Sequence, residues 1–123
     1  MLEMALVLPL FLVLIVGVVE FGRILSVKQV ITNAAREGAR AAAIRLDDAG
    51  AITTAFNTSR TYLSASGIDI TKSQVNSSFL TNSGSPAVQV IVTYSYESML
   101  TQWIPGVPEL LTLRSAAIMR REA

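Results

Sequence analysis

The hydrophobic pattern of the chain begins with an unbroken apolar run of 16 residues, Met4 to Val19, with one acid on each side, Glu3 and Glu20. As a helix the run spans about 24 Å, and extension through Gly22 approaches about 30 Å, the thickness of a bilayer's hydrocarbon core. Such a surface is unfavourable in water. The pattern therefore predicts that this segment enters a membrane, a partner protein or an assembly of copies of the chain.

A helical period continues after the apolar run. From Phe21 to Ile44 there is no proline, and apolar residues recur at the spacing of one helix face. The sequence thus predicts one helix over residues 2–46, apolar all round in its first half and amphipathic in its second. We expect an apolar helix half over residues 1–22 and a small α+β domain over residues 23–123, which includes the amphipathic half.

Small residues mark the amphipathic half of this helix. Ala34, Gly38 and Ala42 are four apart and share a face, where small side chains let another backbone approach closely. The alternative is that alanine is simply the best helix former. Gly38 costs stability inside a helix, which favours close packing.

A second, shorter helix is predicted over residues 49–65. Asp47 and Asp48 end the long helix and offer an N-cap for the second one. The apolar residues expected on one side of the second helix are Ile52, Phe56 and Leu63.

The remaining residues have a β pattern. Residues 68–70 and 74–80 predict an irregular strand, residues 82–86 a turn, and residues 87–96 and 110–121 two alternating strands. Residues 98–109 predict a loop, in which Trp103 is a cap on the small core or an exposed anchor. The expected fold is α+β, with the amphipathic half of the long helix covering one face of a three-stranded antiparallel sheet.

Composition removes most chemistry. The chain has no Cys and no His, which excludes disulfides, thiol chemistry and histidine-based catalysis. No metal, nucleotide or catalytic motif is present, so we expect no cofactor and no enzyme. The net charge of +1 gives no case for nucleic acid. Asn57 and Asn76 begin glycosylation triplets of a kind that arises often by chance.

Two polar positions and one proline stand out near the N-terminus. Glu3 either favours the helix dipole from water or meets an N-terminal amine, its own or a neighbour's, inside an apolar bundle. Glu20 sits in interfacial water or meets an Arg of an adjacent helix. Pro9 removes one backbone hydrogen bond, so it is expected to kink or locally melt the helix.

The flanks of the run bear on its orientation. The run lacks the basic flank and small-residue cleavage site of a secretory signal peptide. Arg23 and Lys28 follow the run and no basic residue precedes it. By charge alone, the C-terminal side would stay cytoplasmic.

At this point the residues resemble a family. The stretches from Glu3 to Phe11, Val19-Glu-Phe-Gly-Arg and Thr32 to Ala43 resemble TadE-like pilin-related proteins of the tight-adherence branch of type IV pilus systems. The late segment from Leu111 to Glu122 is similar to the family's C-terminal strand. Met4 stands where the family often has an aromatic residue, and no Gly precedes Glu3 here.

The resemblance implies a type IV pilin-like fold and a role in assembly. Family members are cut by a prepilin peptidase after a Gly, a few residues before a Glu that Glu3 matches. A basic leader in the precursor holds the N-terminus inside, so the domain after Arg23 faces outward. Subunits wait in the bacterial inner membrane, and an ATP-driven pilus assembly machinery moves them into a cell-surface filament of copies. The residues expected to act in assembly are Glu3, Pro9, Glu20, Phe21 and Arg23.

Three functions therefore stand at this point. The first is a structural subunit of an extracellular pilus-like filament. The second is a minor pseudopilin that primes pilus or secretion assembly. The third belongs to another class, a single-pass membrane-anchored binding domain in the envelope.

Overall fold

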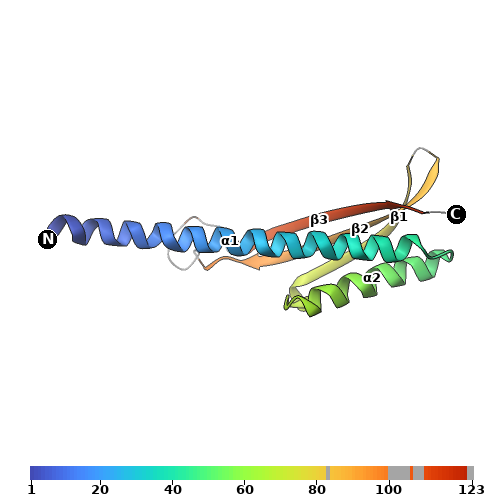
Figure 1. The fold of residues 1–123 in the computed structure, drawn as a ribbon, viewed down its shortest axis with the longest axis horizontal. Coiled ribbons are helices and arrows are strands. Elements are labelled where there is room, and N and C mark those ends of the chain that lie inside the picture. The colour runs from blue at the N-terminus through green and yellow to red at the C-terminus, as the bar shows by residue number, and fades with distance from the viewer. Residues whose placement is uncertain (83, 100–105, 107–109, 122–123) are drawn as a thin grey trace.

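A computed structural model describes residues 1–82, 84–99, 106 and 110–121 of the chain. Figure 1 shows a long N-terminal helix whose second half lies along a small sheet and a second helix. The predicted α+β fold is confirmed. Its elements, in chain order, are α1 (Leu2–Ala43), α2 (Asp48–Ala65), the 3₁₀ helix η1 (Ile70–Lys72), β1 (Ser73–Asn82), β2 (Ser85–Glu97) and β3 (Leu110–Arg120).

The sheet is antiparallel, with β2 between β1 and β3. Val90 of β2 lies opposite Ser77 of β1 and Ala117 of β3, and this register places one residue set on the inner face. The alternation predicted for β2 is confirmed, because Val88, Val90 and Val92 are fully buried there. The second half of α1 and α2 cover this inner face, so the core lies between the helices and the sheet.

Helix α1 is continuous for 42 residues, about 63 Å at 1.5 Å per residue. It continues through Pro9, so the local melting expected there is wrong. The proline removes one backbone bond, and the neighbouring helical bonds hold the chain on both sides. The helix ends three residues earlier than predicted, at Ala43, and Ile44 follows as its C-cap.

The turn between α1 and α2 is held by two side chains. The Asp47 carboxylate accepts a hydrogen bond of 2.9 Å from the backbone N–H of Gly50, which is the predicted N-cap of α2. Arg121, just after β3, donates to the backbone carbonyls of Arg45 and Leu46 and pairs with the Asp48 carboxylate. The C-terminal end of the sheet is thereby tied to the end of α1.

Helix α2 packs closely against the small-residue face of α1. The Ser59 hydroxyl donates to the Ala34 carbonyl at 3.0 Å. A Cβ added to Gly38 would lie 2.0 Å from Ser59 Oγ and 2.9 Å from the Ala55 carbonyl oxygen. The face predicted for α2 is partly wrong, because Phe56 is 37% exposed and the buried residues are mostly small ones, Ala51, Ala55, Ser59 and Leu63.

Residues 68–70 do not form a strand, since the Asp69 carboxylate accepts hydrogen bonds from the Thr71 hydroxyl and backbone N–H, and η1 begins there. These same bonds lower the pKa of Asp69. Trp103 and most of the predicted loop 98–109 lie outside the described residues.

The contact at Gly38 gives a stability prediction with a matched control. Gly38→Ala should lower the free energy of unfolding by about 1–3 kcal/mol, because the new methyl group overlaps the α2 backbone. Gly22→Ala has nothing within 4 Å of its new Cβ, so helix propensity should leave stability equal or slightly higher. Thermal unfolding of the full chain in detergent, followed by circular dichroism, measures both. Equal effects of the two substitutions would contradict the packing described here.

Candidate functional site

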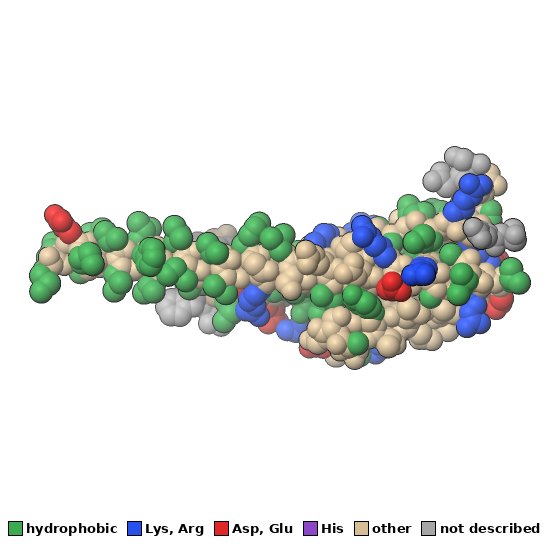
Figure 2. All heavy atoms as spheres, in the orientation of Figure 1, with side chains coloured by type: hydrophobic (Ala, Val, Ile, Leu, Met, Phe, Trp, Pro, Cys, Tyr) green, Lys and Arg blue, Asp and Glu red, His purple; other side chains and the backbone are tan. Residues whose placement is uncertain are grey.

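The first half of α1 has no cover from the other residues that the structure describes. Its large apolar side chains are exposed around the whole helix. Figure 2 shows the green apolar atoms on the face in view. Among the described residues, α1 is the one helix long and apolar enough to cross a membrane, judged by length and composition. Burying one such Leu or Phe side chain is worth about 1.5–3 kcal/mol, so this surface is the strongest candidate for a contact with lipid or protein.

Glu3 lies exposed in the first turn of this helix. No hydrogen bond or ion pair joins its carboxylate to the residues that the structure describes. Its negative charge complements the positive end of the helix dipole. The carboxylate is therefore available to a partner outside this chain.

Glu20, in contrast, is buried at the base of the free helix, with 4% of its surface exposed. Its Oε1 accepts a hydrogen bond of 3.0 Å from the backbone N–H of Met99, just after β2. Its Oε2 lies 3.9 Å from Arg23 Nη1. Glu20 thus has partners within its own chain, while the interfacial water and the adjacent-helix Arg expected for it stay predictions.

Arg23 lies on the same side of α1 as this contact. Its Nη1 donates to the Met99 sulfur at 2.8 Å, and its guanidinium carbon is 6.0 Å from the centre of the Tyr96 ring. We call Glu20, Arg23, Tyr96 and Met99 the polar junction. It joins the end of β2 to α1 at the level where the free apolar helix begins.

The Tyr96 hydroxyl is a buried polar atom without a direct hydrogen bond among the described residues. Burial raises the pKa of the Tyr96 phenol above its ordinary value of 10.0, and the nearby Glu20 charge raises it further. The phenol therefore stays neutral well into alkaline solution while the domain is folded.

The other predicted residues are placed apart from the junction or on its rim. Phe21 is exposed on α1 next to Glu20, and Pro9 lies within the free half. Ala34, Gly38 and Ala42 are fully buried further along α1 in contact with the domain core. The structure therefore brings Glu20 and Arg23 together, and it separates them from the small-residue face.

The sequence pattern does not predict that Tyr96 and Met99 belong to the junction. A signal for the burial of Glu20 was present, since positions 20, 24, 27 and 31 follow the three- and four-residue spacing of the inner helix face. Extension of that face backwards from Ile31 reaches Glu20.

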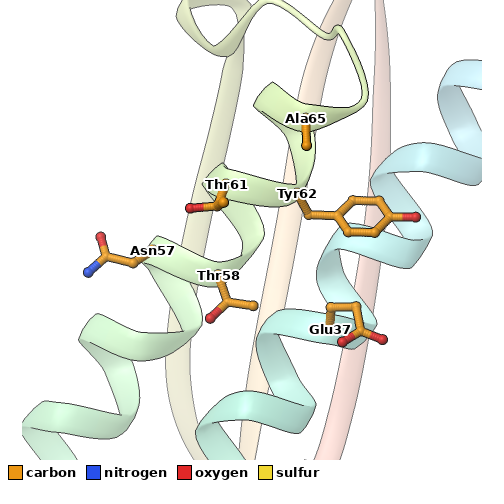
Figure 3. A pocket seen from close by; sticks show the side chains of 6 residues that line it. All are labelled: Glu37, Asn57, Thr58, Thr61, Tyr62 and Ala65. Atoms are coloured by element: carbon orange, nitrogen blue, oxygen red, sulfur yellow. The ribbon is translucent and has the colours of Figure 1, made fainter.

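A shallow groove lies between α1 and α2 on another part of the molecule. Figure 3 shows Tyr62 reaching from α2 toward α1, where Glu37 lies, while Asn57 points away. The groove lining has one acid and no basic side chain (Glu37, Asn57, Thr58, Thr61, Tyr62 and Ala65). No cluster of acids that would hold a metal is found among the described residues. The exposed helix therefore remains the stronger site.

The junction predicts how stability depends on pH. A phenol whose pKa is raised on folding adds stability below its unfolded pKa, and this stability is lost as the pH rises through the folded pKa. Tyr96→Phe should therefore lose less stability than the unchanged chain between pH 8 and about pH 10.5. At pH 8 the phenol is neutral in both the folded and the unfolded chain, so the pH-dependent difference between the two proteins should be absent there. Urea unfolding at both pH values provides the measurement, and an equal loss in both proteins would contradict the placement of Tyr96.

Comparison with known proteins bears on the free helix and the junction. Residues 1–40 match the family described as TadE-like protein. No curated protein and no solved structure matches the chain. The matched residues include Glu3, Pro9 and the helix side of the polar junction, whereas the sheet lies beyond them. The resemblance to the TadE-like family is therefore confirmed, and it is carried by residues 1–40 of this chain.

Proposed function

We propose that this chain is a structural subunit of a type IV pilus-like filament, assembled by packing the free halves of α1 from many copies. One observation carries the proposal. The free half of α1 is apolar and exposed over its whole circumference, while the other half of the same helix forms the core of a folded domain. Together with the TadE-like match, this arrangement fits a pilus-associated protein.

The same surface serves two environments. Before assembly, the free half of α1 anchors the subunit in the bacterial inner membrane. After assembly, apolar helices of other copies replace the lipid around it. Lipid tails are as apolar as leucine side chains, so the exchange itself gains little hydrophobic free energy. An assembly machinery that supplies energy is therefore part of the proposal, as is a prepilin peptidase that prepares the N-terminus.

Glu3 has a specific task in this assembly. A carboxylate in an apolar bundle is costly unless a cation meets it. Glu3 is exposed and has no partner among the described residues of its own chain. The N-terminal amine of an adjacent copy is a cation at the same end of the helix. The pairing of the two groups would fix the axial position of each new subunit.

The test of this function is Glu3→Ala. We expect the variant to insert into the inner membrane normally, while the yield of sheared surface filaments falls at least tenfold, on the order of the loss of one buried charge pair. Glu37→Ala is the matched control, because Glu37 is an exposed acid on the domain half of α1 and should leave the yield unchanged. Negative-stain microscopy and quantitative blotting of sheared material measure the yield.

Other outcomes separate the alternatives. Normal filament yield with Glu3→Ala would sink the amine pairing. A chain present in filaments at a few copies, but needed for their formation, would indicate the minor pseudopilin that primes assembly. A chain that stays in the membrane as single copies would indicate the anchored envelope binding domain.

A further inference from the structure

We propose that copies of this chain pack in parallel along one stripe of α1 that extends past the apolar run as far as Leu25. We call this set of residues the seam. The inference rests on the proposed function and specifies which face of the helix the copies share. The seam residues alternate by three and four positions: Met4, Val7, Phe11, Leu14, Val18, Phe21 and Leu25.

The spacing of apolar residues identifies one particular face of α1 only after Glu20. Between Met4 and Val19 every face of the helix is apolar, so any stripe could be drawn there. Over residues 20–28, Phe21 and Leu25 are the exposed large apolar side chains, at 63% and 49%. They continue the alternation of three and four that forms the contact line between two supercoiled helices.

The charges at this level are turned away from the seam. At 100° per residue, Glu20 lies about 120° and Arg23 about 180° around the helix from the midpoint of Phe21 and Leu25. The polar junction holds both charges on that side, through the Met99 backbone and the Tyr96 ring. The uncharged outer face of α1 is therefore longer than the apolar run in the sequence.

The seam also has a structural end. The next positions of the same spacing are Lys28 and Thr32. Lys28 Nζ donates to the Arg114 carbonyl, and Thr32 Oγ1 lies 2.9 Å from Ser115 Oγ. Arg114 and Ser115 are both residues of β3. From Lys28 onward this face of α1 is therefore occupied by the chain's own sheet, and a neighbouring copy reaches no further than Leu25.

A second copy covers this stripe better than lipid does. Leu25 lies about 7.5 Å beyond Glu20 along the axis, at the level of the folded domain. A bilayer that covered Leu25 would also surround Arg23 and Ser26, which are exposed. A parallel helix, in contrast, would contact the seam residues without surrounding Arg23 and Ser26. Pro9 lies on the opposite side of the helix from Val7 and Phe11, so its ring does not enter the contact.

The absence of cysteine from the chain allows a direct test by disulfide trapping. Parallel copies keep seam residues facing one another with no axial shift or with a shift of seven residues, about 10 Å. The full chain would carry Val18→Cys, Leu25→Cys, or both variants produced together, in native membranes under mild oxidation. The controls are Val19→Cys and Ser26→Cys, which are exposed at the same two levels.

We compare the yield of disulfide-linked dimer. For Leu25→Cys, paired with itself or with Val18→Cys, we expect a yield about fivefold higher than for Ser26→Cys, paired with itself or with Val19→Cys. If Val18→Cys dimerises with itself but Leu25→Cys gives no more than Ser26→Cys, the contact ends with the apolar run and the seam is wrong. The proposed function would then still stand. Equal trapping at all four positions indicates random collision and also overturns the seam. Absence of any oligomer from the unchanged chain would overturn the proposed function as well.

A charge substitution provides a second, independent readout. Leu25→Glu should lower the yield of assembled material at least tenfold, on the order of a charge buried in an apolar contact. Ser26→Glu, one residue on and outside the seam, should leave the yield nearly unchanged. Both side chains are exposed, so thermal unfolding of the domain should be the same in the two variants. Equal yields would count against the seam.

Discussion

The unbroken helical course of α1 from Leu2 to Ala43 is the constraint on which the rest of the structure depends. A single helix passes from a segment without cover into the core of a domain, and no break separates the two halves. Because successive residues advance by a fixed angle, the side on which the domain sits determines the side that the free half can present to a neighbour. In the proposed assembly, packing between copies would therefore be coupled to folding of the domain through the rotation of one helix.

The packing of α2 on α1 keeps the domain thin. Gly38 leaves no room for a methyl group between the two helices, and the Ser59 hydroxyl bonds directly to a backbone carbonyl of α1. The sheet covers α1 from another side, and Arg121 ties its end to the turn between the helices. The result is a domain that follows the axis of α1, with the outer side of the helix left open (Figure 1).

The secondary structure could largely be predicted from the sequence because it depends on the spacing of residues close together in the chain. The extent of α1, the N-cap at Asp47 and the alternation of β2 follow from residue order alone. The inner face of α2 was partly missed because the prediction favoured large side chains such as Phe56. The close approach at Gly38 selects small ones instead, and that distance is a property of two helices together.

The residues of the candidate site also differ in how far the sequence predicts them. Glu3 and the apolar run are local features of the sequence, and the role of Glu3 in assembly stays a prediction. The partner of Glu20, in contrast, lies 79 residues away in sequence. A local reading treats Glu20 as the acid that ends an apolar segment. Only the return of β2 to the base of the helix shows that its carboxylate is bonded within the chain. The helical spacing from Ile31 back to Glu20 indicated a buried position but named no partner.

The polar junction explains how a helix with two charges in its middle can still offer an uncharged face. A buried carboxylate needs hydrogen bonds, and Glu20 obtains one from the Met99 backbone with Arg23 nearby. Because these partners belong to the same chain, the requirement is met before any neighbour arrives. In the proposed assembly, the free helix would pass from lipid to other helices without breaking the contacts that Glu20 makes within its own chain. The charge that interrupts the apolar pattern in the sequence thus lies on the domain side of the helix, and the opposite side remains apolar as far as Leu25.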